Sequence, residues 1–179
     1  MNTIRQQTMG ILMVILAFGM QAGFADNRPG IVEVPQTTDL SALATQAQTK
    51  NLPVLLVFSA QHCAYCVLLE EEILKPMLVS GDYRDRVLIY KVMIDESSDL
   101  LDFNGKSINA ALLAQRYNVY VTPTMLFLDP AGQELSERIL GINTIEMFGG
   151  LVDQAIEMSL KQLRHGGQNL ASNSSGVRP

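Results

Sequence analysis

The sequence has few of the side chains that hold metals, with two cysteines and two histidines among 179 residues. A protein metal site normally takes three or four ligands, and His165 stands near the end of the chain, so no metal site is expected. Basic residues are also scarce, because 13 Lys and Arg stand against 18 Asp and Glu and give a formal net charge of -5. Nucleic-acid binding depends on cationic side chains that neutralise phosphates, so we expect no nucleic-acid partner.

The first 25 residues follow the order of a secretory signal peptide. Arg5 precedes an uninterrupted apolar run from Met9 to Met20, and small residues lead to a cleavage point after Ala25. A membrane anchor is the alternative, but spanning a bilayer takes roughly 20 apolar residues and this run is shorter. Neither cysteine lies near the cleavage point, so no residue there could carry a lipid. These observations predict an exported, periplasmic protein without stable membrane insertion after cleavage.

The rest of the chain has the composition of one globular domain, since 47% of all residues are hydrophobic and 17% are charged. We place this domain at residues 26–165. Residues 166–179 are polar and rich in Gly and Ser, and we expect them to form a disordered tail.

Hydrophobic periodicity predicts alternating helices and strands after a lead-in at 26–37, which is either an edge strand or extended chain. Thr38 or Asp39 can cap a first helix that ends near Lys50 and Asn51. The later elements are a buried strand at 53–58, a helix from 63 to about 77, strands at 87–94 and 124–128, a helix at 107–117, a hairpin strand at 135–140 and a last helix at 143–163. This order predicts an α/β fold in which a mixed parallel and antiparallel sheet lies between two layers of helices, with an extra helix in front.

Cys63 and Cys66 lie where the buried strand passes into an amphipathic helix. At the first turn of a helix, unpaired backbone N–H groups and the positive end of the helix dipole favour an anion, so Cys63 is expected to react as a thiolate nucleophile. Cys66 follows three residues later on the same face and points toward the core with Ile73, which predicts a resolving thiol. The acidic run at 70–72 is predicted to face mostly solvent.

This pair predicts thiol–disulfide exchange through a mixed disulfide, with no cofactor beyond the redox-active disulfide itself. An inert structural disulfide is one alternative, although so small a loop constrains the unfolded chain only weakly. His62 directly precedes the nucleophile. When protonated it would make the disulfide more oxidising, and the alternative is an exposed histidine without a role.

The runs from Val57 to Cys66 and from Tyr117 to Thr124 resemble the thioredoxin family, and the resemblance covers about 40–163. It implies the thioredoxin fold, with three layers in the order α/β/α.

Within this resemblance, Pro123 matches the family's cis-proline, which faces the active-site cysteines. A trans proline at the start of a strand is the alternative. In relatives the backbone next to this proline pairs with the substrate chain, which implies that Thr122 and Pro123 bind substrate. Ala64 and Tyr65 are expected to line the same groove.

Lys91 matches a lysine that standard thioredoxins carry near the resolving cysteine, and an ordinary solvated lysine is the alternative. Two departures accompany these matches. Val57 stands where those proteins bury an acidic residue thought to help deprotonate the resolving cysteine. His62 replaces the tryptophan that normally precedes the nucleophile, and the chain contains no tryptophan.

The signal peptide, the extra front helix and Tyr65 make the chain similar to exported thioredoxin-like proteins, including the SoxW-like group and single-domain relatives of Dsb proteins. The resemblance implies a monomer that takes electrons from a membrane reductant relay and reduces disulfides of exported proteins. The alternatives are a disulfide oxidase or isomerase, or a binding or copper-handling module in which Cys63 and Cys66 are ligands.

Overall fold

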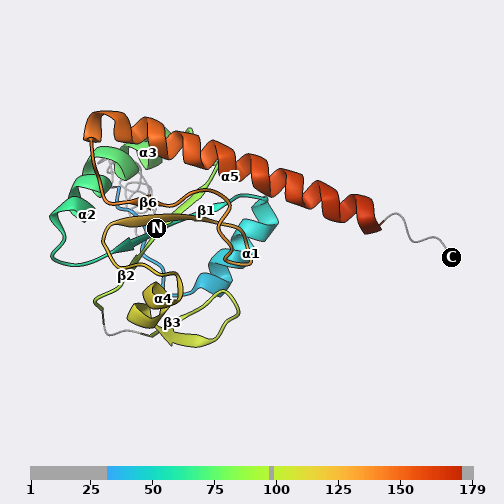
Figure 1. Ribbon diagram of the computed structural model, residues 1–179, viewed down its shortest axis with the longest axis horizontal. Helices are drawn as coiled ribbons and strands as arrows, with labels where there is room; N and C mark the ends of the chain where they lie inside the picture. Colours follow the sequence, from blue (N-terminus) through green and yellow to red (C-terminus); the bar gives the residue numbers. More distant parts are fainter. Residues whose placement is uncertain (1–31, 97–98, 175–179) are drawn as a thin grey trace, which may run out of the picture. The chain divides into compact units, whose positions relative to one another are not determined.

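The computed structural model describes residues 32–96 and 99–174 (Figure 1). The predicted signal peptide, residues 1–25, lies outside these residues. Among the described helices, none combines the length and the apolar character that crossing a membrane requires.

A four-stranded mixed sheet forms the centre of the domain, with its strands in the order β2-β1-β5-β6. The strands are β1 (Val54–Ser59), β2 (Leu88–Met93), β5 (Thr124–Leu128) and β6 (Ile139–Leu140). β2 is parallel to β1, whereas β5 is antiparallel to both β1 and β6. Every residue of β1 and β5 is buried, so these two strands are covered on both faces, as their apolar runs predict.

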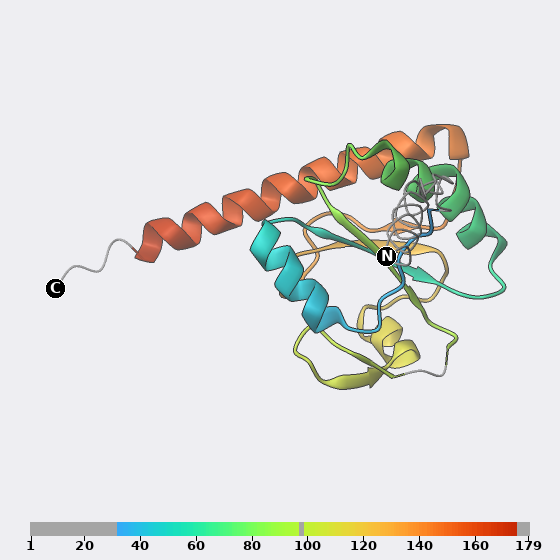
Figure 2. The same cartoon turned by 180° about the vertical axis from the view of Figure 1, so that it is seen from behind.

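Helices cover both faces of this sheet (Figure 1, Figure 2). The helical elements are α1 (Leu40–Lys50), α2 (Ala64–Leu69), the π-helical segment η2 (Glu70–Leu74), α3 (Lys75–Ser80), α4 (Ala110–Arg116) and α5 (Ile145–Ser174). Because side chains alternate along a strand, Leu56 and Phe58 of β1 pack with α1 and α4, whereas Leu55 and Val57 pack with α5 and the stretch from α2 to α3. The predicted three-layer α/β/α arrangement is confirmed, and α1 is the extra helix in front.

α1 begins and ends where its capping residues predict. The Asp39 carboxylate accepts a hydrogen bond from the backbone N–H of Ala42 at 2.9 Å and another from the Ser41 hydroxyl at 2.6 Å. The bond from Ser41 is the main reason why the pKa of Asp39 is lowered. At the other end, Asn51 takes the left-handed conformation with φ 53° and closes the helix.

The described part of the lead-in before α1, residues 32–37, is extended chain that runs along the outer edge of β2. Within its described part, Gln36 forms a single parallel bridge with Lys91. The backbone N–H of Thr37 donates to the Lys91 carbonyl, and the N–H of Lys91 donates to the Pro35 carbonyl, both at 2.9 Å. The lead-in therefore adds cover to the edge of the sheet where Lys91 lies.

The helix predicted at 107–117 is partly wrong. Ser107–Asn109 forms strand β4, which pairs antiparallel with β3 (Asp99–Leu101), and α4 begins only at Ala110. The Asn109 side chain caps α4 by accepting a hydrogen bond from the backbone N–H of Ala111 at 2.9 Å. Ile108 sits opposite Leu100 in this small hairpin, so a partner elsewhere in the sequence decides its conformation.

α5 is longer than predicted, because it continues to Ser174 instead of ending near residue 163. It therefore overlaps residues 166–174 of the predicted disordered tail, while residues 175–179 lie outside the described residues. Once a helix exists, each added residue gains one backbone hydrogen bond, which favours such an extension. Five apolar side chains of α5 are buried and recur at helical spacing: Phe148, Val152, Ala155, Ile156 and Leu160. Leu151, on the same helix, is 48% exposed.

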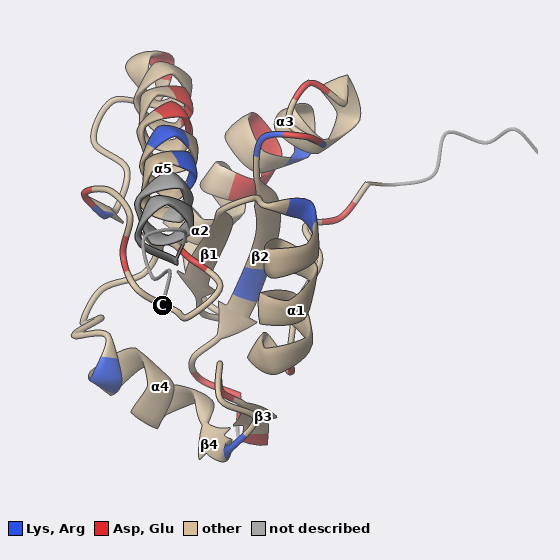
Figure 3. Cartoon of the chain, turned by 90° about the vertical axis from the view of Figure 1, so that its right-hand side faces the viewer, with Lys and Arg blue, Asp and Glu red and all other residues tan. Residues whose placement is uncertain are grey.

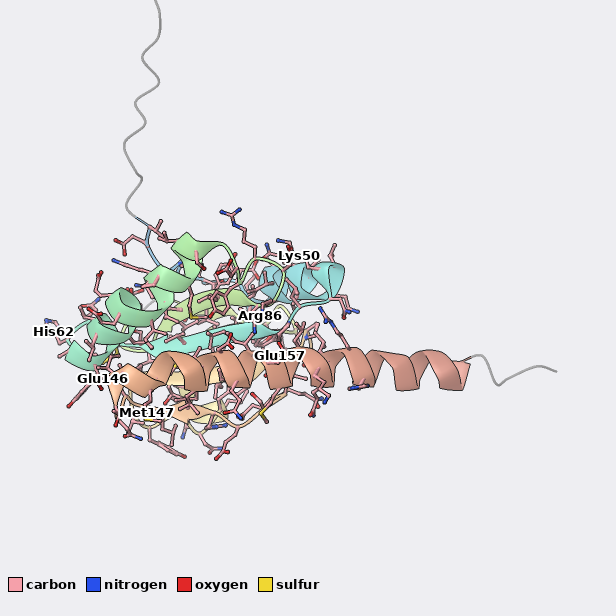
Figure 4. The ribbon with its side chains drawn as sticks, turned by 90° about the horizontal axis from the view of Figure 1, so that it is seen from above. Lys50, His62, Arg86, Glu146, Met147 and Glu157 are labelled. Carbon is pink, nitrogen blue, oxygen red and sulfur yellow. A yellow bond between two sulfur atoms is a disulfide. The ribbon has the colours of Figure 1, made fainter. Side chains whose placement is uncertain are left out.

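α5 is tied to the chain before β2 by one arginine (Figure 4). The Arg86 guanidinium donates to the Asp153 carboxylate at 2.8 Å and to the Glu157 carboxylate at 3.3 Å. Both acceptors lie one helical turn apart, so they present their carboxylates on the same side of α5.

Candidate active site

The loop between β1 and α2 is held by the chain that leaves β2. The backbone N–H of Ile94 donates to the carbonyl of Ser59, the last residue of β1, at 2.9 Å. The backbone N–H of Gln61 donates to the Asp95 carboxylate at 2.8 Å. Asp95 was missed in the sequence, although it directly follows the strand predicted at 87–94. The carboxyl ends of neighbouring parallel strands share one edge of a sheet, and this position was the available signal.

The two cysteines meet at the start of the helix that follows this loop. Cys63 is the N-cap of α2 and forms a disulfide with Cys66, with the two Cα atoms 5.2 Å apart. The backbone N–H of Cys66 points at the Cys63 sulfur at 3.1 Å. An N–H group in this position would also stabilise a thiolate on Cys63 after reduction.

The two sulfur-bearing residues differ in exposure. Cys63 is partly exposed, whereas only 2% of Cys66 is exposed. Cys66 is buried, as are Ile73 and Met77 farther along the helical stretch. An incoming substrate can therefore reach Cys63 more readily than Cys66.

The chain before β5 lies against Cys63. β5 pairs with β1 so that Thr124 sits opposite Phe58, which brings residues 122 and 123 next to the cysteine loop. The Thr122 hydroxyl lies 3.5 Å from the Cys63 sulfur, to which it can donate a hydrogen bond. The Thr122–Pro123 peptide bond is cis. The structure thus brings Thr122, predicted from a distant part of the sequence, into contact with Cys63.

Exposed apolar side chains flank this contact on both segments. On the helix, Tyr65 is 60% exposed, and Val67 is exposed as well. On the segment before Thr122, Tyr120 and Val121 are exposed. Sequence reasoning predicted Ala64 and Tyr65 here and missed the other three. Ala64 and His62, both exposed, complete the helix side. His62 lies at the same end of the domain as Glu146, at the start of α5 (Figure 4).

Behind the disulfide, Lys91 forms an ion pair that the sequence did not predict. Its ammonium lies 2.7 Å from the Glu70 carboxylate, and the exposed fractions of the two side chains are 18% and 14%. Lys91 is the basic residue of β2, visible as the blue band on that strand in Figure 3. The acidic run was predicted to face mostly solvent, and Glu71 and Glu72 are indeed exposed, whereas Glu70 is half-buried against Lys91.

Cys66, Glu70 and Lys91 line one pocket of about 190 Å³. Among the residues that the structure describes, no group of three or more His, Cys, Asp or Glu side chains could hold a metal ion.

Known proteins match this chain at the level of the family and the fold. The family model described as a thioredoxin-like domain matches residues 40–156. No curated protein matches. A poplar thioredoxin h mutant is 16% identical over 73% of this chain and 88% of its own, with a TM-score of 0.50. Wild-type poplar thioredoxin h is 18% identical over 68% of this chain and 96% of its own, with a TM-score of 0.49. Arabidopsis thaliana thioredoxin O2 in its oxidised state is 22% identical over 68% of this chain and 93% of its own, with a TM-score of 0.47.

At 16% identity, the match with a TM-score of 0.50 supports the fold and nothing finer. The matched family and the Cys63–Cys66 pair at a strand-to-helix junction support a thiol–disulfide oxidoreductase in general terms. Because the family model spans 40–156, more than half of the chain, this protein belongs to the thioredoxin-like domain family.

Proposed function

We propose that this protein is an exported thiol–disulfide oxidoreductase that reduces disulfides of other exported proteins. The observation that carries the proposal is the unequal exposure of the two cysteines. Cys63 is partly exposed at the N-cap of α2, with a backbone N–H aimed at its sulfur, while Cys66 is buried beside it. The rate of thiol–disulfide exchange depends on access to the attacking thiol, so this difference in exposure favours Cys63 as the attacking thiol and Cys66 as the resolving thiol.

In the proposed reaction, the Cys63 thiolate attacks one sulfur of a substrate disulfide. A Cys63–substrate bond forms, the substrate disulfide breaks, and the first substrate thiolate leaves and takes up a proton. The Cys66 thiol then loses its proton and attacks the Cys63 sulfur. The Cys63–Cys66 disulfide forms and the second substrate thiolate leaves, so two electrons have passed from the pair to the substrate.

The surface around Cys63 is suited to an extended polypeptide. Thr122 and Pro123 approach the nucleophile from one side, and Ala64 and Tyr65 border it on the helix. We propose that the backbone at 122–123 pairs with the substrate chain while exposed aromatic and aliphatic side chains hold its flanks. Tyr120, 78% exposed, extends this apolar border.

The direction of electron flow is supported by the charge behind the disulfide. A strongly oxidising couple arises when the reduced form is stabilised, chiefly through its thiolate. Here the ammonium of Lys91 is paired with Glu70, which limits how strongly that ammonium can stabilise a thiolate of the reduced pair.

Export is supported by the signal-peptide pattern of residues 1–25. A periplasmic protein of this kind would be a monomer re-reduced by a membrane reductant relay, as in the SoxW-like and Dsb-related proteins that the sequence resembles.

A disulfide oxidase is the second candidate, because one observation favours it. His62 is exposed and directly precedes the nucleophile. A protonated imidazole there would stabilise the Cys63 thiolate and raise the reduction potential.

The reduction potential of the Cys63–Cys66 couple separates the two candidates. The purified protein, from residue 26 to 179, is equilibrated with glutathione buffers, and the fraction of disulfide is measured after acid quenching and alkylation. A reductase should give about -250 mV or lower, near the value of about -270 mV for thioredoxin. A potential close to the value of about -120 mV for DsbA would refute the reductase and favour the oxidase. Cys66→Ser is the matched control, because it cannot form the internal disulfide.

A further inference from the structure

Five charged residues line the pocket behind the disulfide together with the buried cysteine, and one oppositely charged pair among them joins different layers of the fold. Cys66 and Glu70 come from the helix, and Lys91 comes from the sheet. Only 2% of Cys66 is exposed, and less than a fifth of either charged side chain. Charges that are this well shielded from water act on a neighbouring thiol more strongly than surface charges do.

The backbone explains why these three residues meet. Val57 is the register partner of Lys91 in the parallel pair of β1 and β2, so both side chains leave the same face of the sheet. Val57 packs in the core beneath the helix, and Lys91 is therefore directed toward that helix. Cys66 and Glu70 are four residues apart on the helix, a spacing that places their Cβ atoms about 5–6 Å apart.

We propose that Glu70 sets the reactivity of Cys66 by neutralising the ammonium of Lys91 that faces the same pocket. This inference rests on the proposed exchange reaction and names a residue that tunes it. With both charges present, the Cys66 thiolate forms beside a nearly neutral pair. Without the carboxylate, the remaining ammonium would favour the thiolate. Without the ammonium, the remaining carboxylate would oppose it.

The other charged groups around the pocket already have partners. Lys75 donates to Glu71 at 2.7 Å and to Glu33 at 3.1 Å, so these two carboxylates are directed toward its ammonium. The Asp95 carboxylate, at the end of β2, accepts a hydrogen bond from Gln61. Toward the substrate side, the exposed His62 and Cys63 itself are the nearest titratable groups in the sequence. Glu70 is thus the carboxylate paired with Lys91.

The test titrates Cys66 alone, in the full chain carrying Cys63→Ala. Thiolate formation is followed by ultraviolet absorbance between pH 5 and pH 11 and checked by the pH dependence of iodoacetamide alkylation. Glu70→Gln should lower the midpoint of thiolate formation by about one pH unit, roughly a tenfold change in the acid constant. Lys91→Met should raise the midpoint by a similar amount, and the double variant should lie near the parent.

Glu72→Gln is the matched control, because it makes the same chemical change two residues away on the exposed side of the helix. It should move the midpoint less than twofold in the acid constant, since solvent and salt screen an exposed charge. Near-ultraviolet circular dichroism verifies that each variant is folded, and Lys91→Met keeps the test decisive should Glu70→Gln unfold.

An unchanged or raised midpoint in Glu70→Gln would overturn the inference, as would an unchanged or lowered midpoint in Lys91→Met. If Glu70→Gln leaves the midpoint alone but slows closure of the disulfide, Glu70 accepts the proton of Cys66 instead, and charge neutralisation is wrong. The titration needs neither a substrate nor electron flow, so its outcome is separate from that of the reduction-potential measurement. In the intact pair, Glu70→Gln should also shift the glutathione equilibrium toward the dithiol at pH values where Cys66 ionises.

Discussion

Replacing Gly132 by alanine should destabilise the domain for two reasons. The backbone at this turn has a positive φ, which disfavours residues with a Cβ, and neighbouring side chains leave no space for one. Gly132 has φ +80°, and an added Cβ would lie 2.7 Å from Phe103 Cδ2 and 2.7 Å from the Tyr117 hydroxyl. Tyr117 cannot withdraw freely, because its hydroxyl donates to the Gly132 carbonyl at 2.8 Å. Its ring also packs against Phe58, with the ring centroids 6.0 Å apart.

Two physical terms contribute to the expected loss. The left-handed backbone costs about 1–2 kcal/mol for a residue with a Cβ, and inserting a methyl group into a packed site costs about 1–3 kcal/mol. The free energy of unfolding should therefore fall by about 2–5 kcal/mol. In a domain of this size, each kcal/mol lowers Tm by roughly 2–4 °C, so Tm should fall by roughly 5–15 °C.

Thermal and urea denaturation followed by circular dichroism measure this change. Gly150→Ala is the matched control, since Gly150 lies within α5 and an added Cβ would meet nothing within 4 Å. Alanine is the better helix former, so this variant should gain about 0.5–1 kcal/mol. The reasoning fails if Gly132→Ala loses less than about 1 kcal/mol, or if the two variants change in the same direction.

Further predictions concern pH and the two cysteines. Burial raises the pKa of Tyr117 to about 12, so stability should be lost as pH rises from about 10 toward 12, and Tyr117→Phe should weaken that loss in alkaline denaturation curves. The hydrogen bond from Arg116 is the main cause that lowers the pKa of Asp102, so its contribution is present above about pH 4 and lost in stronger acid. Acid denaturation of Asp102→Asn should therefore depend less steeply on pH than that of the parent. Cys66→Ser should accumulate mixed disulfides with substrates on non-reducing gels, whereas Cys63→Ser should accumulate none.

The strand that leads to the cysteine pair, and the helix that follows it, could be predicted from the local pattern of apolar residues. The apolar run at 53–58 gave a strand covered on both faces, and the pattern after Cys63 gave a helix with Cys66 on its buried side. Both features depend on hydrophobic periodicity within a dozen residues, which decides the buried face before any distant contact forms.

The features that the sequence concealed depend on partners far along the chain. Ser107–Asn109 has a helix-compatible pattern, but pairing with Asp99–Leu101 makes it a strand. Asp95 holds the loop before Cys63 from 34 residues away. No local pattern distinguishes such residues from ordinary loop and surface positions, because their role is fixed by the register of strands.

The charged groups near Cys66 come from two different elements, Glu70 from the helical stretch and Lys91 from β2. The sequence placed an apolar residue, Val57, where standard thioredoxins bury an acid, which left Lys91 without an obvious counter-charge. An acid on β1 at this position would face the helix from the sheet, since Val57 and Lys91 are register partners. In this protein the carboxylate that pairs with Lys91 comes from the helical stretch instead, from Glu70, one turn after Cys66. The charge balance behind the disulfide therefore depends on the rotation of the helix about its axis, which is set by the burial of Leu69 and Ile73 against the sheet.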